Sequence, residues 1–124
     1  MTNYMPYYNS LSIADLIQGR DNSNIAWKQL IDGEMLQTNL AISQWYQQIA
    51  SYYSRIAKVQ ESVKQIGAQA ASEIIGRLNT KIANAEWKIS YNKKKILSMK
   101  YDAEQTMMQW NTMINARTTK DAQG

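Results

Sequence analysis

The 124-residue sequence contains no cysteine, no histidine and no phenylalanine, and only one proline and five glycines. Without cysteine, disulfides and thiolate chemistry are excluded, and nothing indicates an oxidising compartment. Without histidine, the chain lacks the commonest general base, the commonest metal ligand and the usual pH-sensitive side chain. The scarcity of proline and glycine favours long, uninterrupted helices.

Several signatures of function are also missing from the sequence. It has no glycine-rich phosphate loop, no paired catalytic carboxylates and no zinc-ligand spacing, so we expect neither an enzyme nor a cofactor. No apolar run approaches the roughly 18 residues that a transmembrane helix needs. The N-terminal segment has neither a basic region nor an apolar core, so we expect no signal peptide, and a location in a virus particle or in the cytoplasm of the producing cell.

Two runs of regularly spaced apolar residues account for most of the chain, and both alternate steps of four and three residues. This is the a/d repeat of a coiled coil. The first run is Ile31, Met35, Thr38, Ile42, Trp45, Ile49, Tyr52, Ile56, Val59, Val63 and Ile66. The second run is Ala71, Ile75, Leu78, Ile82, Ala85, Ile89, Asn92, Ile96, Met99, Ala103, Thr106, Trp110 and Met113.

The two runs are out of phase with each other, and Gly67 lies at the break. We therefore predict an all-α fold, a long antiparallel coiled-coil hairpin with helices near residues 24–66 and 70–117 and a turn near 66–70. The alternative is one continuous helix in a parallel oligomer, because a single glycine costs a helix only about 1 kcal/mol.

The two ends of the chain differ from the coiled-coil region of residues 24–117. Residues 1–23 form a tyrosine-rich arm in which Tyr4, Tyr7 and Tyr8 surround Pro6. Within this arm we expect a short helix that begins after Ser12 and ends near Gly19, followed by a loop over residues 20–23. The polar residues 118–124 are expected to form a flexible tail.

A hairpin folded at Gly67 would bring particular residues of the two helices together. It predicts that Asn92 lies beside Trp45 and that Trp110 lies near Trp27. A buried asparagine fixes the register of a coiled coil because it must find a partner. The alternative is that Asn92 is hydrated.

The outer positions of the second helix carry large apolar side chains that a two-helix seam does not cover. We predict that these form an interface with other copies of the chain, so that oligomerisation completes a larger bundle. The alternative is that the N-terminal arm or a third helix of the same chain covers them. The predicted interface residues are Trp87, Tyr91, Leu97, Tyr101 and Met108, with Tyr46 and Tyr53 flanking the seam of the first helix.

Positive charge gathers in the second half of the chain, where nine Lys and Arg stand against four Asp and Glu over residues 76–124. The flanking positions of the first helix offer few acids to pair with these lysines. We predict a largely unpaired ridge that could contact a polyanion such as nucleic acid. The alternative is an ordinary solvated helix face. The ridge consists of Lys81, Lys88, Lys93, Lys94, Lys95 and Lys100.

The predicted helices are rich in Gln, Asn and Ala and are studded with Trp and Tyr, and residues 42–48 and 107–113 are examples. In this style, residues 24–117 resemble internal virion and DNA-ejection proteins of bacterial viruses. The resemblance implies a structural assembly protein of a particle, forming a helical bundle or tube with copies of itself and other assembly proteins and contacting nucleic acid. Secretion-system stalk proteins and chaperones, which are helical hairpins of similar size that bind a partner helix, are the alternative class.

Overall fold

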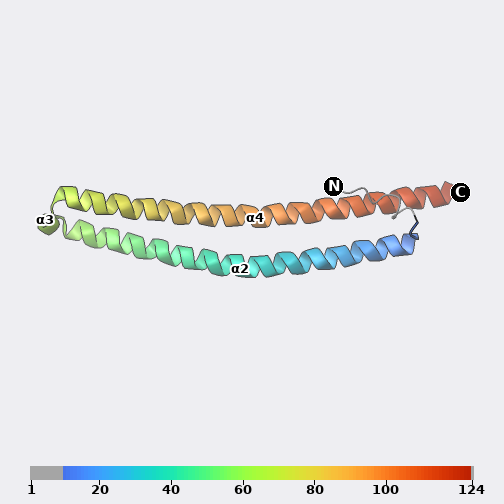
Figure 1. The fold of residues 1–124 in the computed structure, drawn as a ribbon, viewed down its shortest axis with the longest axis horizontal. Helices are drawn as coiled ribbons and strands as arrows, with labels where there is room; N and C mark the ends of the chain where they lie inside the picture. The colour runs from blue at the N-terminus through green and yellow to red at the C-terminus, as the bar shows by residue number, and fades with distance from the viewer. Residues whose placement is uncertain (1–9, 124) are drawn as a thin grey trace. The chain divides into compact units, whose positions relative to one another are not determined.

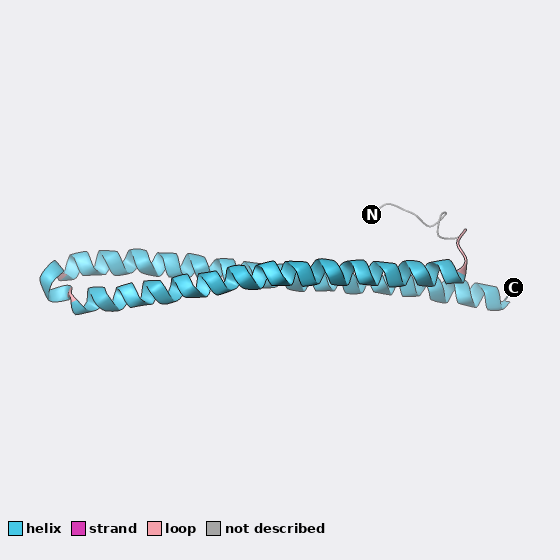
Figure 2. Ribbon diagram, turned by 90° about the horizontal axis from the view of Figure 1, so that it is seen from below, coloured by secondary structure: helices cyan, strands magenta, loops and turns pink. Residues whose placement is uncertain are grey.

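The computed structural model describes residues 10–123, and nearly all of them are helical. Helix α2 spans Ile13–Glu61, the short helix α3 spans Val63–Ile66, and helix α4 spans Ala68–Gln123. Helices α2 and α4 run in opposite directions and pack against each other, with α3 between them in the chain (Figure 1). The described residues contain no strand (Figure 2). The predicted helical hairpin is therefore confirmed, and the continuous helix is excluded.

Helix α2 begins where a reciprocal capping pair satisfies its free backbone amides. The amide of Asp15 donates to the Ser12 hydroxyl at 3.1 Å, and the amide of Ser12 donates to the Asp15 carboxylate at 3.4 Å. Ser12 is thus the predicted N-cap. The predicted loop over residues 20–23 is wrong, because α2 continues without interruption. Contacts with α4 stabilise this stretch: the Arg20 guanidinium donates to the side-chain oxygen of Asn111 at 3.1 Å.

The turn between the long helices occupies residues 62–67, so it begins earlier than the predicted 66–70. Gly67 ends α3 with φ +93° and ψ 150°, and its N–H donates to the Val63 carbonyl at 2.9 Å. Only glycine adopts this conformation without strain. The Gly67 carbonyl then accepts from the amide of Ala71 at 3.0 Å, in the first turn of α4. The prediction that Gly67 marks the break is confirmed.

Helix α4 extends further than the predicted residue 117. The stretch assigned to a flexible tail is helical up to Gln123. Two local interactions support it: the Arg117 guanidinium pairs with Asp121 at 3.3 Å, and the Thr118 hydroxyl donates to the Ile114 carbonyl at 2.8 Å. Neighbouring side chains four residues apart stabilise a helix by a few tenths of a kcal/mol, about 0.2–0.5.

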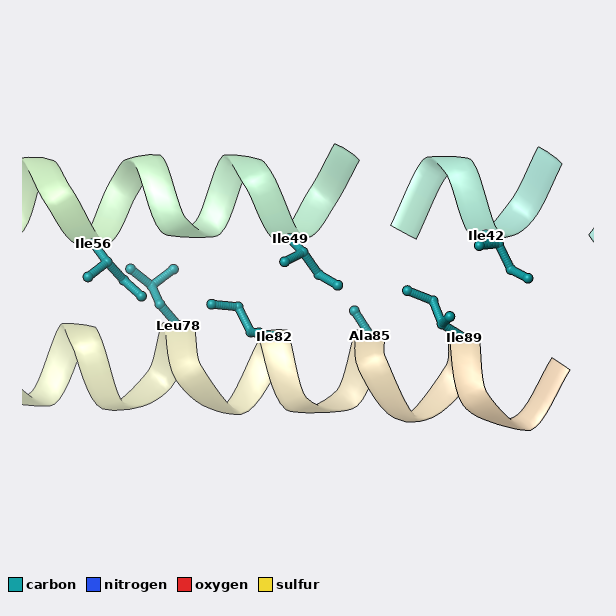
Figure 3. Packing of buried hydrophobic residues seen from close by; sticks show 7 residues of the cluster. All are labelled: Ile42, Ile49, Ile56, Leu78, Ile82, Ala85 and Ile89. Carbon is teal, nitrogen blue, oxygen red and sulfur yellow. The ribbon is translucent and has the colours of Figure 1, made fainter. Parts of the chain in front are cut away.

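Contacts divide the helices into two units. The turn unit is Glu34–Ile96, and the end unit comprises the described residues 10–33 and 97–123. In the turn unit, apolar side chains of α2 and α4 interdigitate along one seam (Figure 3). Its buried members are Ile42, Ile49, Ile56, Leu78, Ile82, Ala85 and Ile89, with Trp45, Tyr52 and Ile75 packed against them. All of these residues belong to the predicted a/d runs.

In the end unit, Leu16 of α2 is the most deeply buried side chain, with 2% of its surface exposed. Ile114 of α4 is also buried. Gly19 approaches the ring of Trp110 so closely that a Cβ on Gly19 would stand 2.7 Å from the ring atom Cη2. A small residue on one helix thus makes room for the largest side chain on the other.

The predicted pairing between the helices needs correction. Ile42 faces Ile89 across the seam (Figure 3). Asn92 lies beyond Ile89, whereas Trp45 lies on the turn side of Ile42, so Asn92 and Trp45 are not opposite each other. The side-chain amide of Asn92 donates instead to the Lys88 carbonyl of its own helix at 2.8 Å.

The second predicted pair is also wrong. Trp110 packs on Gly19, about two helical turns before Trp27. Both errors have one cause: the chain turns from Ser62 onward rather than at Gly67 alone, which shifts every pair between the helices.

Candidate assembly and polyanion-binding surfaces

The outer face of α4 carries large side chains that the hairpin leaves uncovered. Every residue of α4 that we predicted to form an interface has more than half of its surface exposed. These residues are Trp87 and Tyr91 in the turn unit, and Leu97, Tyr101 and Met108 in the end unit. No described residue of α2 covers them, and most of the N-terminal arm, which is the alternative cover, lies outside the described residues.

In the turn unit the exposed aromatics form an ordered pair. The rings of Trp87 and Tyr91 stack with their centroids 5.3 Å apart and their planes inclined by 16°. A spacing of four residues brings two side chains together on one helix face. Despite the stacking, Trp87 is 65% exposed and Tyr91 is 57% exposed. Each ring covers only the face of the other ring that it stacks against.

In the end unit the exposed residues of α4 form a narrow apolar stripe. Leu97 and Tyr101 are four residues apart, and Met108 follows seven residues after Tyr101. These spacings place all three on one side of the helix. The exposed fraction of Tyr101 is 60%.

The two predicted flanking tyrosines lie on α2 in the turn unit, and both are exposed. Tyr46 is engaged by α4: the Lys93 ammonium donates to the Tyr46 hydroxyl at 3.3 Å and lies 5.8 Å from the centre of its ring. Tyr53 makes no hydrogen bond or ion pair within the described part of the chain. Of the two, Tyr53 is therefore the freer to meet a partner.

Three lysines of the predicted ridge have partners on α2, but only one of these partners is an acid. Lys95 pairs with Glu34 at 3.7 Å, and Lys93 contacts Tyr46 as described above. Lys81 lies 5.9 Å from the centre of the Tyr52 ring. Such cation–π contacts contribute about 0.5–1 kcal/mol at exposed sites. The aromatic flank of α2 takes the place of the acids that an ordinary coiled coil would use.

The other three lysines of the ridge, Lys88, Lys94 and Lys100, have no ion pair with any described residue and are exposed. Lys88 and Lys94 belong to the turn unit, and Lys100 to the end unit. The turn unit carries nine Lys and Arg against four Asp and Glu, a net charge of +5. The end unit carries five against six, a net charge of −1. Net positive charge is thus confined to the turn unit.

Several exposed aliphatic residues on α2 were not among the predicted interface residues. Leu36 and Leu40 in the turn unit, and Ile25 and Leu30 in the end unit, all have more than half of their surface exposed. The four-residue spacing of Leu36 and Leu40 was the available signal.

The exposed surface of the chain is large for its mass. Its accessible area is 9174 Å². A compact monomer of 14.3 kDa exposes roughly 6800 Å² by the usual scaling, about a quarter less. The excess, about 2400 Å² for one chain, is larger than the roughly 800 Å² that a standard-size protein interface buries on each partner.

Within the described residues, no three His, Cys, Asp or Glu side chains come together as a metal site would need, and no helix carries an apolar stretch long enough to cross a membrane. Comparison of the chain with protein-family models, with curated proteins and with solved structures finds no match.

Proposed function

We propose that this chain is a non-enzymatic assembly protein whose hairpins associate with one another through the outer face of α4. The observation that supports this most strongly is the exposed stripe of Leu97, Tyr101 and Met108 in the end unit. Large apolar side chains that line up on one exposed face are typical of an interface. The excess surface of the chain is more than one such interface would cover on each copy.

Charge favours the end unit over the turn unit as the place of self-association. Two copies of a surface with net charge +5 repel each other, whereas a surface with net charge −1 and both signs present does not. Around Tyr101 the charges are mixed, with Lys100, Asp102 and Glu104 all nearby in the sequence. We therefore assign the contact between copies to Leu97, Tyr101 and Met108, and not to Trp87 and Tyr91.

The size of the stripe sets the strength of the contact. Burying a fully exposed large apolar side chain contributes about 1.5–3 kcal/mol, so three partly covered side chains on each of two copies contribute roughly 6–10 kcal/mol. Association itself costs about 4–15 kcal/mol. The stripe alone thus supports weak, concentration-dependent association, and the exposed Ile25 and Leu30 of α2 offer further apolar surface in the same unit.

A particle component fits this behaviour, because many weak contacts between identical subunits build a bundle or tube that no single contact holds. The composition of the helices, which resembles that of internal virion and DNA-ejection proteins of bacterial viruses, supports the same class. A secretion-system stalk or chaperone would instead keep this face for a partner helix. Such a protein would remain a monomer or a fixed dimer on its own.

Sedimentation velocity at concentrations from about 1 µM to 1 mM tests the proposal, because that range covers association free energies of about −8 to −4 kcal/mol. We expect the mean mass to rise with concentration. Tyr101→Ala should lower the mass at each concentration, and Trp87→Ala, an equally exposed aromatic on the same helix, should not. A constant monomer mass would contradict self-assembly and favour a partner helix.

A further inference from the structure

The stacked pair of Trp87 and Tyr91 leaves ring surface open to a planar ligand. With their centroids 5.3 Å apart, the two rings are too close for a third ring to enter between them. The outer faces can instead extend the stack, and both residues are more than half exposed. A base that stacks on an aromatic side chain contributes binding free energy whatever its identity, because every base has a π face.

Cations surround this pair on the same helix. Lys94 follows Trp87 by seven residues and Tyr91 by three, which places it in line with the rings. Lys88 follows Trp87 by one residue and Lys95 follows Lys94 by one residue, so both lie about 100° around the helix from this line, on the same side. Lys88 and Lys94 have no ion pair within the described residues, and the whole turn unit carries a net charge of +5. The face therefore combines stacking surface with free positive charge.

Two other polyanions fit this face less well. Duplex DNA keeps its bases stacked on each other, so it offers phosphates to the lysines but no base faces to the rings. A lipid surface needs a broad apolar face to insert, yet the residues within a turn of the pair include Asn84, Ser90 and Lys94. A single strand offers both exposed bases and phosphates.

We propose that the outer face of α4 from Trp87 to Lys95 binds single-stranded nucleic acid. Bases stack on the outer faces of Trp87 and Tyr91, and Lys88 and Lys94 contact the phosphates on either side of them. The site lies wholly within the turn unit, whereas the proposed assembly stripe lies in the end unit. This inference is independent of the proposed self-assembly.

Binding of a fluorescein-labelled oligothymidylate of about 20 nucleotides to the full chain, followed by fluorescence anisotropy, tests the site. We expect Trp87→Ala to weaken binding by about fivefold to 150-fold, which is the range measured when one stacked base loses its aromatic partner. Tyr101→Ala is the matched control, since it removes an equally exposed aromatic of α4 outside the basic unit. It should leave the affinity unchanged.

The salt dependence of binding reports on the lysines. For a single strand, the slope of log K against log salt falls by about 0.7 for each phosphate contact that is lost. The double variant Lys88→Gln/Lys94→Gln should therefore flatten the slope by about 1.4. The control Lys58→Gln/Lys64→Gln removes the same charge from the turn unit away from the rings. It should leave the slope nearly unchanged.

A substitution at Glu34 should have the opposite effect on the salt dependence of binding. Its carboxylate holds the ammonium of Lys95 at 3.7 Å. Glu34→Gln releases that lysine for a further phosphate, so we expect tighter binding and a slope steeper by up to about 0.7.

Three results would overturn the inference. The first is no binding of the oligonucleotide at low salt. The second is equal affinity of the wild type and Trp87→Ala, which would reduce the interaction to charge alone. The third is binding to a duplex of the same length, or to vesicles containing phosphatidylserine, at least as tight as to the single strand. Because Tyr101→Ala reports on assembly and Trp87→Ala on binding, either proposal can fail without the other.

Discussion

Replacing Gly19 by alanine tests the packing of the end unit. A change from glycine to alanine inside a helix usually raises the free energy of unfolding, whereas at Gly19 we expect it to lower that free energy. A glycine inside a helix destabilises it by about 1 kcal/mol relative to alanine. At Gly33 and Gly76 an added Cβ would meet nothing within 4 Å. Gly33→Ala and Gly76→Ala should therefore each raise the free energy of unfolding by about 1 kcal/mol.

At Gly19 the same methyl group would meet the ring of Trp110, at 2.7 Å from Cη2 and 2.9 Å from Cζ3. Carbon atoms pack at about 3.5–4.0 Å, so the ring must move away by roughly 1 Å. Overpacking of this kind costs about 1–3 kcal/mol, which offsets or exceeds the gain in helix propensity. We expect Gly19→Ala to lower stability by up to about 2 kcal/mol.

Urea unfolding followed by far-UV circular dichroism measures these differences, at one protein concentration because assembly adds apparent stability. The sharpest comparison is a double-mutant cycle with Trp110→Leu, whose shorter side chain leaves room for the methyl group. In that background Gly19→Ala should become stabilising, as it is at Gly76. If Gly19→Ala stabilises the otherwise unchanged chain by about 1 kcal/mol, Trp110 does not pack on Gly19 and the reasoning is refuted.

Three further substitutions test the turn, the seam and the start of α2 by the same unfolding measurement. Gly67→Ala should destabilise by about 1–3 kcal/mol because φ is +93°, and no loss would mean that the turn differs from the one described. Ile82→Ala, in the buried seam, should destabilise by about 2–5 kcal/mol, whereas the partly exposed Ile74→Ala should change stability much less; equal losses would contradict the seam. Ser12→Ala should cost about 0.5–2 kcal/mol through loss of the cap to Asp15, and an unchanged stability would show that α2 does not begin there.

The seam of the hairpin was predictable because its signal is local and repeated. Steps of four and three residues identified every buried apolar residue of the turn-unit core, and the positive φ of Gly67 explains the phase break. The capping residue Ser12 was also recognisable from its type and position.

The remaining features depend on contacts between distant residues. Residues 20–23 have the composition of a loop, and they are helical because α4 packs beside them through Asn111 and Trp110. The register between α2 and α4 could not be predicted from the sequence because it depends on how many residues form the turn. The partners of Lys93 and Lys95 follow from that register, so their contacts with Tyr46 and Glu34 were missed for the same reason.

The exposed stripe of the end unit is where the proposed function can be tested most directly. The decisive measurement is the mass of the chain in solution as a function of concentration, for the wild type and for Tyr101→Ala. Self-assembly through Leu97, Tyr101 and Met108 predicts a mass that rises with concentration in the wild type and rises much less in the variant. A wild-type chain that keeps the mass of a single copy at every concentration would contradict it.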